Sequence, residues 1–326
     1  MKSRLPTLSF VVVILSLSAI GVLLVHTGLM GKRPFAKKTA EFSIGLYAGK
    51  NPFNLTFPNN VKNPILTAAD VTDAMADYVA DPFMVRKGGK WFMFFEVVNN
   101  RTKQGDIGLA VSKDGSNFVY KQIVLDEPFH LSYPYVFRWK GNYYMIPESR
   151  QANSVRLYRA KHFPTEWSFV KTLLVGDYKD SSIFRHGDKW WLFAGSDYKH
   201  NDKLCLFYAD NLMGPWLEHP RSPIVKGDPH IARPGGRVIS FADKIIRFAQ
   251  DDYPRYGNQV RAFEILELTT TNYREKEFKV SPILKASGSG WNAAGTHHID
   301  PHQIASKKWI ACVDGYRQTT VSRNKK

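Results

Sequence analysis

The chain has 326 residues, of which 44% are hydrophobic and 13% are aromatic. This composition can fill a sizeable core and excludes a chain that is disordered throughout. The formal charge of +16 would suit anionic headgroups or acidic glycans. A solvated basic surface explains the same surplus without a partner, and no nucleic-acid motif accompanies it, so nucleic acid is not an expected partner.

The two cysteines, Cys205 and Cys312, both lie in apolar runs typical of strands. Neither has the spacing of a metal site, so we expect buried free thiols. The sequence accordingly predicts no metal and no cofactor.

The N-terminal segment is apolar and uncharged over residues 8–25. Its length just reaches what a helix needs to cross a bilayer, and no clear small-residue cleavage site follows it. We therefore expect residues 8–30 to form an uncleaved signal anchor or transmembrane helix, with a cleaved signal peptide as the alternative. Residues 1–7 would be a short cytoplasmic tail, and residues 31–41 a basic linker.

This organisation predicts a single-pass membrane protein of the Golgi or secretory pathway, with its main body in the lumen. In a bacterium, it predicts an exported and membrane-anchored protein. The positively charged residues on both sides of the apolar segment leave its orientation open.

A repeated hairpin organises the rest of the chain. Asp81-Pro82-Phe83, Tyr133-Pro134-Tyr135 and Asp180-Ser181-Ser182 each open a short strand, which a Gly-containing turn connects to an aromatic strand. The offset from the first residue to the Lys or Asn before the second strand is nine in all three copies. Weaker copies start at Arg233-Pro234-Gly235-Gly236 and Asp300-Pro301. Five copies of one hairpin indicate a repeat architecture.

A third strand follows every hairpin except the last, and the missing strand is found at residues 42–47. An N-terminal strand that completes the last repeat would close a ring and hide the sheet edges. We therefore predict an all-β fold, a five-bladed β-propeller over residues 42–317, followed by a disordered basic tail at residues 318–326. A β-sandwich is the alternative, but it would not predict this circular permutation of the repeat.

The repeat openings resemble those of the glycosidase-like propeller superfamily of arabinanases, xylosidases and invertases. A closer resemblance is to the N-terminal domain of plant glucosamine inositolphosphorylceramide transferases, over roughly residues 42–317. The motifs that carry it are Asp81-Pro82-Phe83, Tyr133-Pro134-Tyr135-Val136-Phe137, Ile146-Pro147-Glu148, Asp180-Ser181-Ser182, Arg233-Pro234-Gly235-Gly236 and His297-His298-Ile299-Asp300. Those transferases carry their glycosyltransferase in a further C-terminal domain, which we expect this chain to lack.

The innermost strand of each propeller blade lines the central funnel, so the first residues of the repeats should converge. An inverting glycosidase needs one carboxylate to activate water and one protonated carboxyl to donate to the leaving oxygen. The resemblance implies that Asp81 stands where the general base stands and Asp180 where the acidic donor, usually Glu, stands. Tyr133 replaces the Asp that tunes the donor. The candidate catalytic residues are thus Asp81 and Asp180.

The candidate substrate-binding residues also lie near the repeat openings: Tyr133, Glu148, Arg233, His297, His298 and Asp300. Glu148 could replace the donor, but Glu96 has the same repeat position, which indicates a structural role. Adjacent histidines in a strand point to opposite faces, so at most one of them should face the funnel. Each carboxylate could instead stabilise a turn, and Arg233 could form a structural ion pair.

The main functional hypothesis is a membrane-anchored, glycosidase-like propeller that binds a glycan or glycolipid and supports glycosyl transfer, together with a separate glycosyltransferase. One alternative is an active glycan-processing hydrolase that uses Asp81 and Asp180. Another is a non-catalytic scaffold for protein interactions. A close pair of carboxyls in a sugar-sized pocket would favour the hydrolase, and a filled funnel would favour the scaffold.

Overall fold

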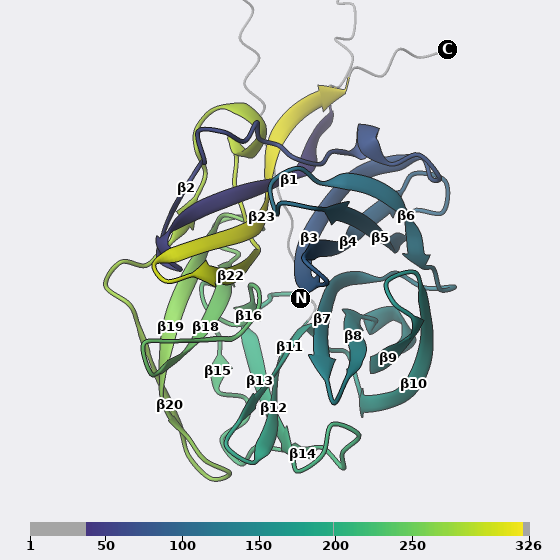
Figure 1. Cartoon of the computed structure of the whole chain (residues 1–326). Helices are drawn as coiled ribbons and strands as arrows, with labels where there is room; N and C mark the ends of the chain where they lie inside the picture. Colours follow the sequence, from purple (N-terminus) through teal and green to yellow (C-terminus); the bar gives the residue numbers. More distant parts are fainter. Residues whose placement is uncertain (1–36, 198, 322–326) are drawn as a thin grey trace, which may run out of the picture.

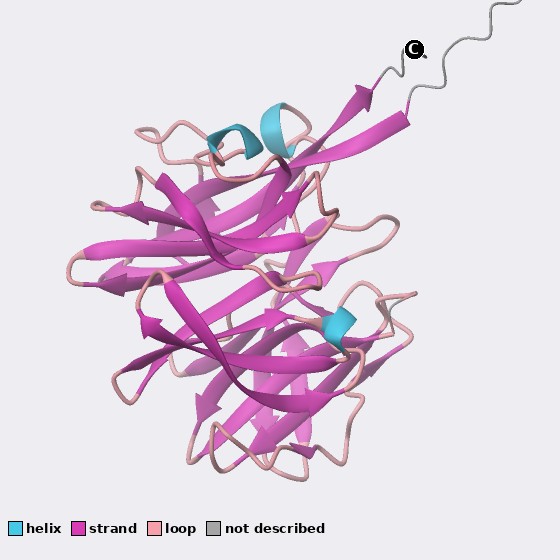
Figure 2. Cartoon of the chain, turned by 90° about the vertical axis from the view of Figure 1, so that its right-hand side faces the viewer, coloured by secondary structure: helices cyan, strands magenta, loops and turns pink. Residues whose placement is uncertain are grey.

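The computed structural model describes residues 37–197 and 199–321. The predicted anchor at residues 8–30 lies outside this part of the chain. Within the described ranges, no helix combines the length and the apolar character that crossing a membrane requires. The only helices described there are three short 3-10 turns (Figure 2).

Five antiparallel sheets stand around one axis, which confirms the predicted five-bladed propeller (Figure 1). The first blade contains β3 (Ala76–Lys87), β4 (Lys90–Asn99), β5 (Gly105–Ser112) and β6 (Val119–Leu125). The second contains β7 (Ser132–Trp139), β8 (Asn142–Glu148), β9 (Ser154–His162) and β10 (Glu166–Val175). The third contains β11 (Lys179–His186), β12 (Lys189–Ser196), β13 (Lys203–Ala209), β14 (Leu217–Glu218) and β15 (Val225–Lys226).

The inner strand of the fourth blade is split in two. That blade contains β16 (Arg233–Pro234), β17 (Ile239–Phe241), β18 (Lys244–Asp251), β19 (Gln259–Leu268), β20 (Tyr273–Glu277) and β21 (Leu284–Lys285). The interruption falls at Gly236, which has a φ of 142° and approaches the fifth blade so closely that an added Cβ would lie 1.8 Å from the carbonyl oxygen of Ile299. Only glycine fits this contact, which accounts for the Pro-Gly-Gly motif.

The N-terminal strand closes the ring as predicted. The fifth blade has the order β2 (Asn54–Thr56), β1 (Lys37–Asn51), β23 (Lys308–Val321) and β22 (Ile299–Ala305). The β1–β23 ladder runs without interruption from Lys37 opposite Val321 to Gly49 opposite Trp309. Its outer end forms a two-stranded ribbon that extends beyond the blades (Figure 2).

The second strand of each blade is covered on both faces by neighbouring blades. Met93, Phe94 and Phe95 are consecutive in β4, and all three are fully buried. Phe94 packs in one cluster with Tyr135 of the next blade, whereas Met93 and Phe95 pack in another with Ile44 of β1. Burial on both faces explains why these strands are continuous aromatic runs and do not alternate with polar residues.

The first three inner strands share a bulge near their start. Asp81, Tyr133 and Asp180 have φ angles of 53°, 46° and 47°, and the ladder skips two residues at each of these places. Left-handed backbone at a residue other than glycine costs roughly 1–3 kcal/mol and tends to be kept at functional or tightly constrained sites. The nine-residue offset shared by the three repeats therefore corresponds to the same strained bulge in each inner strand.

The fifth blade has a different register from the one that the sequence repeat suggests. Asp300 lies opposite Cys312, as Phe83 lies opposite Phe94 in the first blade. His298, two residues earlier, is therefore the counterpart of Asp81. The alignment of Asp300 with Asp81 was wrong because the ladder of the fifth blade contains one extra residue between Gln303 and Ala305, so that the equivalent offset, from His298 to Lys308, is ten rather than nine.

The closing strand should be essential for stability. Ile44 is 0% exposed, so we expect Ile44→Ala to lower the free energy of unfolding by about 2–5 kcal/mol. Ile304→Ala, a matched change at a residue of the same blade that is 41% exposed, should cost less than about 0.5 kcal/mol. Urea unfolding followed by tryptophan fluorescence measures both. Equal losses would contradict the role assigned to the closing strand.

Candidate functional site

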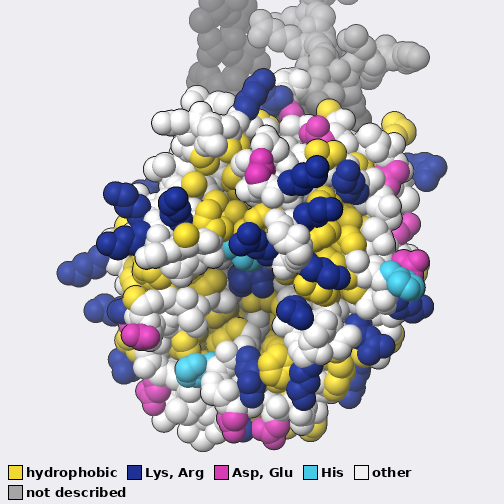
Figure 3. All heavy atoms as spheres, viewed as in Figure 1, with side chains coloured by type: hydrophobic (Ala, Val, Ile, Leu, Met, Phe, Trp, Pro, Cys, Tyr) yellow, Lys and Arg dark blue, Asp and Glu magenta, His cyan; other side chains and the backbone are white. Residues whose placement is uncertain are grey.

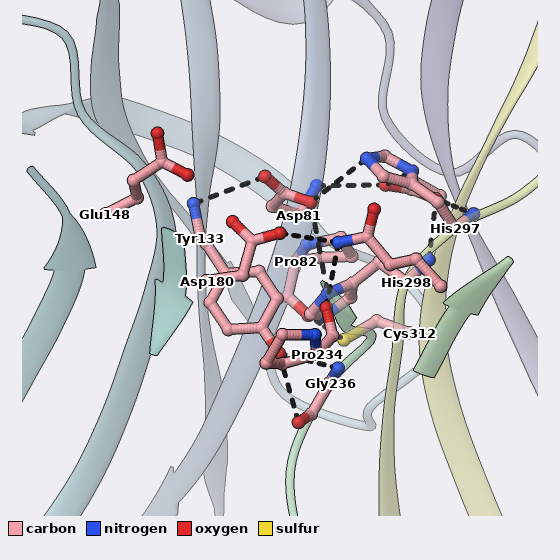
Figure 4. Close-up of polar contacts among 12 residues, drawn as sticks. Asp81, Pro82, Tyr133, Glu148, Asp180, Pro234, Gly236, His297, His298 and Cys312 are labelled. Atoms are coloured by element: carbon pink, nitrogen blue, oxygen red, sulfur yellow. Dashed lines mark hydrogen bonds and ion pairs between the residues drawn. The ribbon is translucent and has the colours of Figure 1, made fainter. Parts of the chain in front are cut away.

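The side chains at the axis link neighbouring blades to one another (Figure 4). The backbone N–H of Asp81 donates to Asp314 Oδ2 of the fifth blade at 3.3 Å. The N–H of Tyr133 donates to Asp81 Oδ2, also at 3.3 Å. The left-handed backbone thus turns these N–H groups toward the carboxylate of the preceding blade.

Tyr133 fills the middle of the axis. Its ring is fully buried, and its hydroxyl lies 2.8 Å from Ser182 Oγ of the third blade and 2.6 Å from the Gly236 nitrogen of the fourth, which donates to it. It also donates to the Gly236 carbonyl at 3.1 Å. The residue that replaces an expected Asp is therefore a structural plug that joins three blades.

Asp300 belongs to a deeper layer than Asp81 and Asp180. It accepts the Met84 N–H at 2.6 Å and pairs with Arg237 at 2.5 Å and His302 at 2.8 Å. Arg237 also donates to the carbonyl of Val136. Its partners Arg237 and His302 lower the pKa of Asp300 despite its burial, so this carboxylate is fully engaged within the protein.

Asp81 lies between two histidines at the inner end of the site. His297 Nε2 is 3.4 Å and His298 Nδ1 is 4.0 Å from its Oδ1, which has no hydrogen-bond donor. Burial raises the pKa of Asp81 well above its usual range, and the charge of His297 opposes this. A raised pKa marks a candidate functional group, although a buried structural network has the same effect.

The two histidines carry different charges. Burial opposes charge on His297, but Asp314, 2.8 Å from its Nδ1, and Asp81 raise its pKa to about 9. Burial lowers the pKa of His298 to about 4, and its Nε2 lies 2.9 Å from the Pro82 carbonyl. At neutral pH, His297 is thus a cation held mainly by Asp314, and His298 is a neutral hydrogen-bond donor.

Asp180 and Glu148 form a carboxyl pair next to Arg233. Arg233 Nε lies 2.5 Å from Asp180 Oδ2, and Gln250 donates to the same oxygen at 2.6 Å. Burial would raise the pKa of Asp180, but Arg233 reverses the shift and lowers it. Burial and the charge of Asp180 raise the pKa of Glu148 to about 8. The pair therefore holds one proton at neutral pH, and this proton resides on Glu148.

The pair Asp81 and Asp180 is brought together at the axis, but neither side chain reaches solvent: their residues are 4% and 1% exposed. Arg233 is engaged by Asp180 and lies within 4.0 Å of Glu148. Tyr256 is 42% exposed, and its ring lies 5.1 Å from the Arg233 guanidinium and 5.0 Å from the His297 ring. We define the outer end of the axis, formed by Glu148, Arg233 and Tyr256, as the mouth.

Asp314, Gln250 and Arg237 are important residues of the axis that the sequence reasoning missed. A signal existed for two of them. Glu96, Glu148, Gln250 and Asp314 each stand six residues after the Lys or Asn that opens the second strand, so the recurrence of polar residues at this position could have been extended to the fourth and fifth blades. For Arg237 the repeat offers no counterpart.

Among the described residues, one buried cluster of side chains has the spacing of metal ligands, and a proton on His297 can balance its charge. Asp81, His297 and Asp314 each offer one atom, and these atoms lie within 4.8 Å of one another. Asp314 already accepts the N–H groups of His297 and His298, and protonated His297 lies between the two carboxylates. This charge balance accounts for the cluster without a cation.

Comparison with known proteins agrees with this fold. The family described as glucosamine inositolphosphorylceramide transferase 1, N-terminal, matches residues 36–316. The transferase of that name from Oryza sativa subsp. japonica is 38% identical over 300 residues, which cover 85% of this chain and 40% of the relative. The chain therefore belongs to the family of glucosamine inositolphosphorylceramide transferase N-terminal domains, and it spans less than half the length of that relative.

Solved structures show the same fold at low sequence identity. The β-1,2-mannobiose phosphorylase from Listeria innocua is 14% identical, with a TM-score of 0.59 over 82% of this chain and 96% of that one. An exo-1,5-α-L-arabinanase from a bovine ruminal metagenomic library is 12% identical, with a TM-score of 0.55 over 73% of this chain and 93% of that one. The expected relationship to the arabinanase-type propellers is confirmed at the level of the fold.

Removing the hydroxyl of the axial plug should destabilise the ring. Tyr133→Phe leaves Ser182 and the Gly236 N–H without their buried partner, so we expect the free energy of unfolding to fall by about 1–3 kcal/mol. Tyr253→Phe, at a tyrosine that is 56% exposed, serves as the control and should be nearly neutral. Chemical denaturation decides between the two, and a neutral Tyr133→Phe would show that the hydroxyl does not join the blades.

The raised pKa of Glu148 has a defined effect on stability. In the unfolded chain this carboxyl loses its proton near 4.5, whereas in the folded protein it keeps it up to about 8. The folded state binds more protons between these values, so this group's contribution to stability falls as the pH rises.

Glu148→Gln imitates the protonated carboxyl at every pH. Relative to the unsubstituted protein, we expect the variant to gain stability as the pH rises from about 5 to about 8. Melting temperatures across this range measure the difference, and Glu218→Gln, on an exposed strand residue, controls for the change in net charge. A difference that does not change with pH would mean that Glu148 titrates normally.

Proposed function

We propose that this propeller binds a glycan or the sugar headgroup of a glycolipid at the mouth and supports glycosyl transfer without carrying it out. The observation that carries the proposal is the half-exposed residue Tyr256, whose ring lies beside Arg233, together with Glu148, which lies 4.0 Å from the same Arg233. An aromatic face next to a few oriented polar groups is a common composition for a small-molecule site. A neutral Glu148 can donate a hydrogen bond to a sugar hydroxyl, while Tyr256 offers its ring face.

The burial of the two candidate catalytic carboxylates favours binding over hydrolysis. A general base must reach water, yet Asp81 lies under His297 and is 4% exposed. Asp180 is neutralised by Arg233 and cannot serve as a proton donor, because its pKa is lowered. We therefore assign Asp81, Asp180 and His297 a supporting role beneath the ligand-binding surface. Arg233 orients the carboxyl groups of Asp180 and Glu148.

Two alternative functions each have an observation in their favour. The opposite pKa shifts of Glu148 and Asp180 are typical of carboxyls with separate acid and base roles, and they favour a glycan hydrolase with Glu148 in place of Asp180 as the donor. The filled axis around Tyr133 and His298 favours a non-catalytic scaffold.

The relatives support the link to glycosyl transfer. The rice relative is named glucosamine inositolphosphorylceramide transferase 1, and the matching family describes the N-terminal part of that transferase. We propose that this chain works with a glycosyltransferase on a separate chain or domain. The anchor proposed at residues 8–30 would hold the propeller at a lumenal membrane surface, where a glycolipid headgroup is accessible.

A binding experiment with a paired variant tests the proposed site. Isothermal titration with phosphorylated and uncharged glycans should detect a ligand, and Tyr256→Ala should weaken its binding by about tenfold or more through loss of the ring contact. Tyr253→Ala removes a tyrosine from the same loop, one that is 56% exposed, and should leave binding unchanged. An equal effect of both changes would refute the site.

The same glycans, incubated with Asp81→Asn beside the unsubstituted protein, separate the alternatives. Binding without release of sugar supports the proposal. Release of sugar that Asp81→Asn abolishes establishes the hydrolase. If the protein folds normally but binds none of the glycans, the remaining alternative is a non-catalytic scaffold for protein interactions.

A further inference from the structure

A hollow with a volume of about 420 Å³ lies at the opposite end of the inner strands from the mouth. Three hairpin turns of the first and second blades form it, those of β3–β4, β7–β8 and β9–β10. Lys87 in its wall is six residues beyond Asp81 in β3, which corresponds to about 20 Å along a strand. We call this hollow the turn pocket; it shares no residue with the mouth.

The charge of the turn pocket is entirely positive. Arg86, Lys87, Arg138 and Lys161 line it, and none of its lining residues is acidic. In the part of the chain that the structure describes, none of these four side chains forms an ion pair with a carboxylate, although the charge of Lys161 contributes to the lowered pKa of Glu166 on β10. Several like charges around one hollow attract a counter-ion with more than one negative charge. On the face shown in Figure 3, Lys and Arg are widely spread and the acidic side chains lie mainly toward the edge.

The floor of the turn pocket is aromatic. The rings of Tyr143 and Phe163 stack with centroids 3.9 Å apart and an interplanar angle of 25°. Lys87 Nζ lies 5.0 Å from the centre of the Phe163 ring and 5.5 Å from that of Tyr143, so its charge is held over the floor. Gly141 also lines the pocket. Its φ is 82°, and the space where a Cβ would lie is free of other atoms within 4 Å.

We propose that the turn pocket binds a phosphate ester carried on a sugar or polyol ring. Two guanidinium and two ammonium groups match the several acceptor oxygens of a phosphate, for which Arg provides a fork and Lys a point charge. The stacked rings offer an apolar surface to the carbons of the ring that carries the phosphate. The phosphate could belong to a soluble sugar phosphate or to a phospholipid headgroup at a membrane surface.

A charge-matched pair of variants tests this site. Arg138→Ser with Lys161→Ser removes two charges from the turn pocket. Lys113→Ser with Lys121→Ser removes two from a neighbouring groove on the first blade that also contains Asp114. All four cations are exposed, so both variants should fold, and circular dichroism and melting temperature verify this before binding is measured.

Two probes distinguish the sources of the phosphate. Glucose 6-phosphate and inorganic phosphate are titrated by calorimetry, and sedimentation measures binding to phosphatidylcholine vesicles with and without phosphatidylinositol 4-phosphate, a lipid that carries a phosphate ester on a polyol ring. We expect the unsubstituted protein to bind at least one phosphate ester more tightly than inorganic phosphate. The turn-pocket variant should bind it at least about tenfold more weakly, and the groove variant should bind it within about twofold of the unsubstituted protein.

The outcomes separate clearly. Binding to glucose 6-phosphate supports a soluble ligand, and binding only to vesicles that contain phosphatidylinositol 4-phosphate supports a lipid headgroup. Equal weakening by both variants would mean a general attraction to the basic surface and would overturn the site, as would the absence of binding to every probe. Because Tyr256→Ala leaves the turn pocket intact, failure at the mouth and failure here are independent results.

Discussion

The ring depends on polar contacts that cross from blade to blade at its axis. Asp314 and Asp81 each accept a backbone N–H from the following blade, and the Tyr133 hydroxyl connects the second blade with the third and fourth. Asp180 joins the third blade to the fourth through Arg233. Buried polar networks of this kind are stable only when their members are satisfied together, so the axial residues form one cooperative unit.

This constraint decides where chemistry can take place. Because the middle of the axis is filled by Tyr133 and His298, a ligand can meet the polar groups of the axis only at its outer end. There Arg233 neutralises Asp180, so the proton of the carboxyl pair resides on Glu148. Arg233 was a candidate ligand-binding residue in the sequence. In the structure it acts mainly by keeping Asp180 ionised, which leaves the proton on Glu148.

The repeat and its closing strand were predictable because strand periodicity and the nine-residue offset are local features of the sequence. The role of Tyr133 was not, since its hydroxyl bonds to residues 49 and 103 positions away. Asp300 was misaligned because one extra residue between Gln303 and Ala305 shifts the register of β22 relative to the other inner strands. The pKa values of Glu148 and His297 depend on burial and on neighbours from other blades, which no spacing reveals.

The inner strands also separate two kinds of electrostatic environment. β3 carries Asp81 toward the mouth, where carboxyls and their paired cations balance, and ends at Lys87 in a pocket without carboxyls. About 20 Å of strand separates them, and at this distance two unit charges interact by less than about 1 kcal/mol at an effective dielectric constant of about 20. Charge changes at one end should therefore be felt weakly at the other, so that the strand that holds the axis together also keeps the two proposed sites electrostatically independent.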